Sequence, residues 1–162
     1  MIQPSWAFIT SHPIHFLAFG FGTGLSPKAP GTVGTLLGLP LYYGLQLILP
    51  PSGIFIVLVL LFVAGIYICD VSGKAVGVQD HSGIVWDEIV AVALVLMFVP
   101  LTTTGFISAF ALFRLFDIWK PFPIGYCDRH FHNGFGVMFD DLLAAVYAIA
   151  VILIVENILL PS

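Results

Sequence analysis

Two pairs of adjacent acids stand out from an otherwise apolar sequence. Asp87 and Glu88 lie at the start of one apolar run, and Asp140 and Asp141 lie at the start of another. Neighbouring carboxylates in apolar surroundings are costly unless something cationic holds them. Complementing a helix dipole explains one acid of each pair but not two. Oxygen ligands of this kind are those that Mg²⁺ prefers, so we predict that these four acids bind Mg²⁺.

A second set of polar residues is predicted to take part in catalysis. Asp80 and His81 precede the first acidic pair, and Arg114, Asp117 and Lys120 are spaced i, i+3, i+6 just before a Pro-Phe-Pro. On a helix this spacing places the three side chains on one face, and the prolines end the helix. A buried Arg–Asp pair that fixes helix packing, beside a snorkelling lysine, is the structural alternative.

The segment from Gly20 to Gly34 is rich in glycine and proline. Glycines let backbone N–H groups approach an anion, and Ser26, Lys28 and Thr32 add donors, so we predict a phosphate-binding loop that contacts the substrate. Arg114 and Lys120 are expected to contact the same phosphate. The segment does not match the Walker pattern, and an ordinary Gly/Pro-rich turn has the same composition.

The sequence lacks the motifs that are typical of several other kinds of site. The five histidines form no H-E-x-x-H, and Cys69 and Cys127 have no metal-binding spacing, which argues against zinc. No G-x-S-x-G indicates a serine nucleophile. The formal charge of −4 includes no basic patch, so no nucleic-acid partner is expected.

The elements that must position these residues are apolar and of membrane length. Hydrophobic residues make up 59% of the 162, only 9% are charged, and the mean hydropathy is +1.07. We predict an all-α, multi-pass membrane bundle forming one domain over residues 1–162, with a short interfacial or re-entrant helix at Ile14–Phe21. A soluble helical bundle is the alternative, but the runs have no polar stripe to cover its surface. Five spans are expected: 33–49, 53–69, 84–99, 105–119 and 140–160.

The loops between these runs alternate in character. Segments 70–83 and 120–139 are charged, whereas 50–52 and 100–104 are not. With this division all five basic residues and eight of the nine acids fall on one face, and only Glu156 falls near the other. The positive-inside rule places the charged face in the cytoplasm and the C-terminus outside. The N-terminus has no charged region or cleavage motif typical of a signal peptide.

Four motifs in order, GFGTGLSPKAPGTVGT, GVQDHSGIVWDE, FRLFDIWKPFPI and GFGVMFDDLLAAV, resemble the phosphatidylglycerophosphatase A family of bacterial inner-membrane enzymes. The resemblance covers the chain from about His15 to the last span. It implies Mg²⁺-dependent hydrolysis of the phosphate monoester of phosphatidylglycerol phosphate, giving phosphatidylglycerol in phospholipid biosynthesis. The acids of the family motifs correspond to Asp80, Asp87, Glu88, Asp117, Asp140 and Asp141.

The expected mechanism is in-line attack of water on a phosphoryl group whose charge Lys28, Arg114 and Lys120 neutralise. His81 or Asp80 would protonate the leaving alkoxide. An aspartyl-phosphate intermediate is the rival within the same chemistry. Other classes are also open: an ion or small-solute transporter that uses the carboxylates, a CDP-lipid transferase, whose D-G-x-x-A-R pattern is missing, and a noncatalytic scaffold. The sequence leaves the oligomeric state open.

Overall fold

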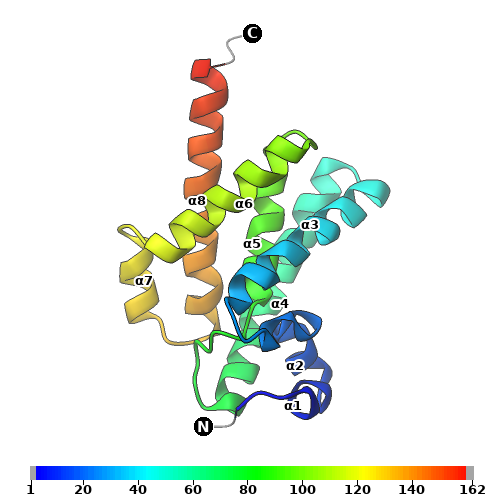
Figure 1. Ribbon diagram of the computed structural model, residues 1–162, viewed down its shortest axis with the longest axis vertical. Coiled ribbons are helices and arrows are strands. Elements are labelled where there is room, and N and C mark those ends of the chain that lie inside the picture. The colour runs from blue at the N-terminus through cyan, green and yellow to red at the C-terminus, as the bar shows by residue number, and fades with distance from the viewer. Residues whose placement is uncertain (1–2, 160–162) are drawn as a thin grey trace.

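The computed structural model describes residues 3–159, and within them every regular element is helical (Figure 1). This confirms the all-α prediction; Leu160, the end of the last expected span, lies outside the described residues. The elements are α1 (Trp6–Thr10), α2 (Pro13–Ala18), the 3-10 helix η1 (Gly20–Leu25), α3 (Pro30–Ile48), α4 (Pro51–Val76), α5 (Trp86–Leu96), α6 (Thr103–Trp119), α7 (Ile124–His130) and α8 (Gly134–Leu159).

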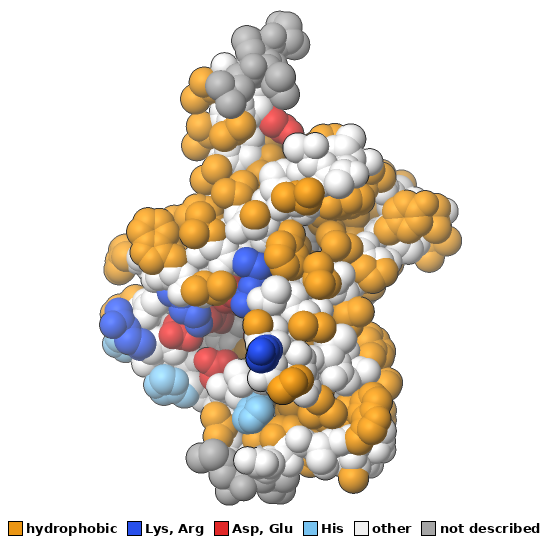
Figure 2. Space-filling model, viewed as in Figure 1, with side chains coloured by type: hydrophobic (Ala, Val, Ile, Leu, Met, Phe, Trp, Pro, Cys, Tyr) orange, Lys and Arg blue, Asp and Glu red, His pale blue; other side chains and the backbone are white. Residues whose placement is uncertain are grey.

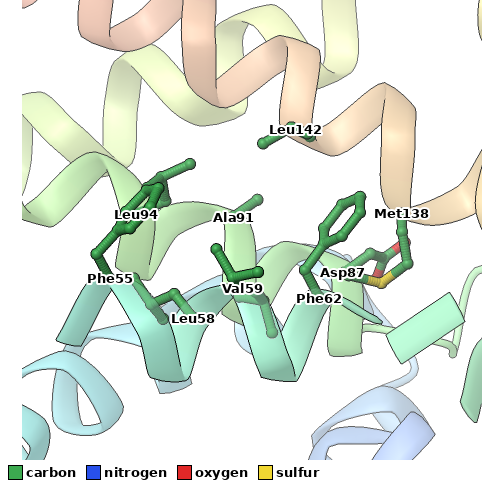
Figure 3. Close-up of a pocket in the computed structure, with 10 residues that line it drawn as sticks. Phe55, Leu58, Val59, Phe62, Asp87, Ala91, Leu94, Met138 and Leu142 are labelled. Carbon is green, nitrogen blue, oxygen red and sulfur yellow. The ribbon is translucent and has the colours of Figure 1, made fainter. Parts of the chain in front are cut away.

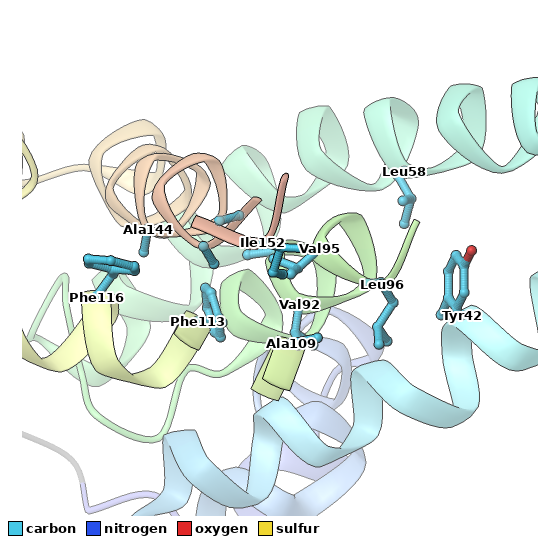
Figure 4. Packing of buried hydrophobic residues seen from close by; sticks show 14 of the residues in the cluster. Tyr42, Leu58, Val92, Val95, Leu96, Ala109, Phe113, Phe116, Ala144 and Ile152 are labelled. Atoms are coloured by element: carbon cyan, nitrogen blue, oxygen red, sulfur yellow. The ribbon is translucent and has the colours of Figure 1, made fainter. Parts of the chain in front are cut away.

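Helix α5 is the centre of the bundle. It packs against α3, α4, α6 and α8, and nine of its eleven residues are buried. Its Val92, Val95 and Leu96 join Phe113 of α6 and Ala144 of α8 in the main hydrophobic core (Figure 4). A helix that is apolar all round is expected in such a position. The charged start of α5 is therefore held in the interior by the packing of the rest of the helix.

Helices α3 and α5 approach each other closely through small residues on α3. A Cβ atom added to Gly34 would lie 2.5 Å from the Cβ of Val85, and one added to Gly38 would lie 2.1 Å from Cγ1 of Val92. Neither distance is compatible with a side chain. Small residues allow backbones to approach in this way in apolar bundles. The contact brings the start of α3 beside the acidic start of α5.

Several boundaries differ from those expected. The N-terminal segment forms α1, α2 and η1 in place of one short helix, and α3 begins at Pro30, inside the expected phosphate loop. Helix α4 continues to Val76, so that the first part of the charged segment 70–83 is helical. Segment 120–139 contains α7, whose Ile124 and Cys127 are buried, as well as the first residues of α8. In α7 the buried residues recur at helical spacing, and the surrounding glycines and prolines concealed this signal.

Two helices in the described part of the chain, α4 and α8, are long and apolar enough to cross a membrane. At 1.5 Å per residue the 26 residues of α4 extend about 39 Å. Helix α5, with 11 residues, extends only about 17 Å, which is short of the ~30 Å hydrocarbon core. Each of the five expected runs contains a long part of one helix, but five crossings remain a prediction.

Large apolar side chains cover much of the outer surface, as Figure 2 shows for one face. On α4, for example, Leu60, Val63 and Tyr67 are each about 60% exposed. Lipid-facing helices present such surfaces, whereas contiguous apolar patches of this kind are rare on soluble monomers. The exposed surface and the two long helices together indicate association with a membrane.

Candidate active site

The predicted acids gather around one polar cavity of about 260 Å³. In Figure 2 it lies within a hollow where red and blue side chains meet, below a surface that is mostly orange. The cavity lies where the starts of α3 and α5, the end of α6 and the second turn of α8 come together. Its lining residues are Ala29, Pro30, Gly31, Asp80, Ser82, Ile84, Asp87, Glu88, Arg114, Asp117, Lys120, Asp140 and Asp141. All six acids singled out in the sequence therefore share one site with two of the cations.

Within each acidic pair one residue is bound by a cation and the other is not. Arg114 donates to Glu88 over 3.0 Å, and Lys120 donates to Asp140 over 2.7 Å. Asp87 and Asp141 are only 7% and 4% exposed, yet Oδ1 of Asp87 and Oδ2 of Asp141 have no hydrogen-bond partner among residues 3–159. Buried polar atoms are nearly always hydrogen-bonded. These two oxygens are therefore free to bind a ligand.

Each of the two cations joins two acids from different segments. The guanidinium of Arg114 also donates to Asp117, 2.5 Å away and one turn along α6, as the i, i+3 spacing predicted. The ammonium of Lys120 also donates to Asp128, 2.5 Å away on α7. Burial lowers the pKa of Lys120, but Asp140 and Asp128 raise it more, so the pKa lies above its ordinary value and the lysine stays charged.

Helix geometry explains how these side chains reach the cavity. Arg114 and Asp117 share one face of α6, which ends at Trp119 before the prolines, as predicted. Lys120 follows in a left-handed conformation with φ 46°, a conformation in which its side chain reaches α7 and α8. Asp140 and Asp141 lie in the second turn of α8, because α8 begins at Gly134 and not at the pair. A dipole effect within the first turn therefore does not account for these two acids.

The start of α3 forms one wall of the cavity through backbone and not through side chains. A Cβ atom on Gly31 would lie 1.9 Å from Oε1 of Glu88 and 3.2 Å from a terminal nitrogen of Arg114. Only glycine leaves room there for the Glu88–Arg114 pair. The Gly/Pro-rich segment thus contributes to the site, although the contribution comes from Ala29, Pro30 and Gly31.

The three donors predicted from that segment lie outside the cavity. Lys28 is exposed, and Ser26 donates its hydroxyl hydrogen to the Lys28 carbonyl. Ser26 lines a separate hollow beside Trp6, and Thr32 lies in the first turn of α3 without lining either space. The structure therefore does not place Ser26, Lys28 and Thr32 around the acids. The loop ends where α3 begins at Pro30, two residues before Thr32.

Of the two candidate proton donors, Asp80 lines the cavity and His81 does not. The Nδ1 atom of His81 accepts a hydrogen bond from the backbone N–H of Gly83, and partial burial lowers the pKa of the ring, although Asp80 raises it. For Asp80, withdrawal from water raises the pKa, and Asp128 and Asp117 add to this effect, whereas Lys120 opposes it. Of the two, Asp80 is the one placed to give a proton inside the cavity.

The donor set around the cavity fits a hard divalent cation. Among the described residues no three His, Cys, Asp or Glu side chains already converge on a single point. Unpartnered buried oxygens nevertheless belong to three of the four predicted ligands, Asp87, Glu88 and Asp141. Carboxylate oxygens without a proton donor are what Mg²⁺ requires. The residues present therefore fit Mg²⁺ by chemistry, with small side-chain movements needed to bring them together.

Comparisons with known proteins point to one family. Residues 16–156 match the family model described as phosphatidylglycerophosphatase A. A phosphatidylglycerophosphatase A from Haemophilus influenzae is 48% identical over 146 residues, covering 90% of each chain. One from Escherichia coli is 42% identical over 143 residues, covering 88% of this chain and 83% of the relative.

A third relative carries a different name. A putative phosphatidylinositol-3-phosphatase from Bacteroides thetaiotaomicron is 41% identical over 140 residues, covering 82% of this chain and 87% of its own. No solved structure matches the chain. The family model spans most of the chain, including all six acids of the cavity, and two relatives above 40% identity carry its name. The chain therefore belongs to the phosphatidylglycerophosphatase A family.

Proposed function

We propose that this protein is a Mg²⁺-dependent lipid phosphatase that hydrolyses the phosphate monoester of phosphatidylglycerol phosphate, in phospholipid biosynthesis. The names of the two most similar relatives described above support the reaction. The main structural support for this proposal is one cavity that is lined by six acids together with Arg114 and Lys120. A transporter is not favoured, because the relatives are named as phosphatases.

The two cations would bind the phosphoryl group of the substrate. Arg114 is held by Glu88 and Asp117, and Lys120 is held by Asp128 and Asp140, so both charges are fixed before a substrate arrives. Charges positioned in advance stabilise a transition state because they need not reorganise during the reaction. We assign Arg114 and Lys120 to neutralising the transferring phosphoryl group.

The metal would be held by Asp87, Glu88, Asp140 and Asp141. When bound, Mg²⁺ would polarise the phosphoryl oxygens and lower the pKa of a bound water. The acids themselves exclude other anions from the cavity, since four carboxylates repel a phosphate that arrives without cations. Asp80, whose pKa is raised, would hold the proton that the leaving alkoxide needs.

The location we propose is the cytoplasmic face of the bacterial inner membrane. Glu156 lies about 22 Å along α8 from Asp141, near the opposite end of that helix, whereas six acids, Arg114 and Lys120 line the cavity. With α4 and α8 crossing the bilayer, the cavity would lie at headgroup depth. The positive-inside rule then orients it toward the cytoplasm.

The test is phosphate release by the purified protein in detergent. Wild-type protein with Mg²⁺ is expected to release phosphate from phosphatidylglycerol phosphate, and chelator or Asp87→Asn is expected to abolish the release. Phosphatidylinositol 3-phosphate belongs in the same assay, because a 41% identical relative carries that name. Release from neither lipid with any divalent metal would refute the proposal. Trapping of a labelled phosphoenzyme would replace direct water attack with the aspartyl-phosphate route.

A further inference from the structure

A second cavity, of about 210 Å³, lies between α4, α5 and α8 (Figure 3). Nine of its ten lining residues are apolar. They are Phe55, Leu58, Val59 and Phe62 of α4, Val90, Ala91 and Leu94 of α5, and Met138 and Leu142 of α8; the tenth is Asp87. We call this space the apolar groove. The predicted catalytic groups do not occupy it, apart from Asp87.

The apolar groove adjoins the polar cavity at Asp87. This residue lines both spaces, and its Oδ1 atom has no hydrogen-bond partner in the part of the chain that the structure describes. In Figure 3, Asp87 lies with Phe62 and Met138 at one end of the groove, and Leu94 and Phe55 lie at the other. Phe62 lies seven positions after Phe55 on α4, a rise of about 10 Å. The groove therefore leads from the charged site along the bundle.

One side of the apolar groove is open. Phe55 and Val59 are 52% and 44% exposed, whereas Leu58 and Ala91 are 3% and 5% exposed and form its floor. The opening lies on α4, which is long and apolar enough to cross a membrane. A molecule dissolved in the bilayer could enter sideways between α4 and α8 without passing through water.

We propose that the apolar groove holds one acyl chain of the lipid whose phosphate occupies the polar cavity. This inference rests on the proposed function. The ligand must have a charged head next to an apolar tail, because the two spaces meet at a single residue. The bilayer interior is as apolar as the groove, so the chain gains little affinity by moving into it. The groove would instead contribute to catalysis by orienting the substrate, since a bound acyl chain fixes the position of the headgroup relative to Arg114 and Lys120.

Narrowing the mouth of the groove tests the proposal. Val59→Trp adds bulk at the exposed mouth, and Val63→Trp is the matched control, because Val63 lies one turn along α4, is 59% exposed and does not line the groove. Both variants are compared with wild type on dioleoyl phosphatidylglycerol phosphate and on its deacylated, water-soluble headgroup. We expect Val59→Trp to lower kcat/KM about tenfold for the dioleoyl lipid and less than twofold for the headgroup. Val63→Trp should match wild type on both.

The outcomes separate this inference from the proposed function. An equal loss on both substrates, a similar loss in Val63→Trp, or no loss at all would overturn the acyl-chain assignment while leaving the phosphatase intact. A wild-type protein inactive on both substrates would instead refute the proposed function. A lipid with a photoactivatable acyl chain gives a readout independent of activity. Labelling of Phe62, Leu94 or Leu142 supports the proposal, and labelling confined to the outer faces of α4 and α8 indicates bulk lipid and overturns it.

Discussion

Neutralising Asp141 should stabilise the metal-free protein and inactivate the enzyme. Asp141 is 4% exposed, and its Oδ2 atom has no partner. A buried polar group left unpaired costs about 1–3 kcal/mol, and more if it is charged. Asn keeps the shape of Asp, removes the charge and lets an amide donate to neighbouring carboxylates. We therefore expect Asp141→Asn to raise the free energy of unfolding in chelator by about 1–3 kcal/mol, a shift of several degrees in Tm.

Mg²⁺ should stabilise wild type more than it stabilises Asp141→Asn. A ligand at 100 times its Kd stabilises the protein that binds it by about 2.7 kcal/mol. Wild type should gain this stabilisation and Asp141→Asn should lose most of it, together with at least a hundredfold in kcat. Thermal unfolding in detergent with chelator and with increasing Mg²⁺, beside phosphate release, measures both effects.

The control for this experiment is Glu156→Gln, the same change of acid to amide near the other end of α8. It should alter neither the activity nor the response of the Tm to Mg²⁺. If Asp141→Asn lowers the Tm in chelator, the carboxylate has a structural partner and our account of its unpaired oxygen is wrong. If the variant retains full activity, Asp141 is not a metal ligand.

Three further substitutions test the arrangement of the cavity. Gly31→Ala should lower kcat/KM at least tenfold in the phosphatase assay, because the new Cβ would lie 1.9 Å from Oε1 of Glu88; unchanged activity would show that Glu88 can move without consequence. Arg114→Lys should also cost at least tenfold, since one ammonium does not reproduce the geometry with which a guanidinium joins Glu88 and Asp117. Lys28→Ala should change kcat/KM less than threefold, because Lys28 is exposed and outside the cavity; a tenfold loss in the same assay would show that the loop closes over the substrate.

The acids of the site could be predicted from the sequence because their cost is local. A carboxylate within an apolar run is costly to bury wherever the run lies in the fold. Asp87 and Asp141 could therefore be selected as site residues without knowledge of their neighbours in space. The Arg114–Asp117 pair could be predicted for a similar reason, since i, i+3 spacing fixes proximity on any helix. The five longer helices follow from the lengths of the apolar runs.

Contacts between distant segments could not be predicted in the same way. Asp128 pairs with Lys120 only because α7 folds back beside the end of α6, and nothing local distinguishes Asp128 from a solvated acid. The sequence signal that could have suggested it is the i, i+3 recurrence of Ile124 and Cys127, which predicts a short helix. Ser26, Lys28 and Thr32 lie outside the polar cavity, and composition alone does not say which way such side chains point. Their contact with the substrate stays a prediction.

The division of each acidic pair into a bound and an unbound member links the two cavities. Consecutive helical residues point about 100° apart, so Glu88 can bind Arg114 while Asp87 lies between the polar cavity and the apolar groove. If both acids of each pair were bound by cations, fewer carboxylate oxygens would be left for a metal. If neither were paired, four buried charges would repel one another without compensation. The observed arrangement fixes two cations for a phosphate and keeps two carboxylates for a metal, one of them at the point where a lipid headgroup would meet its chain.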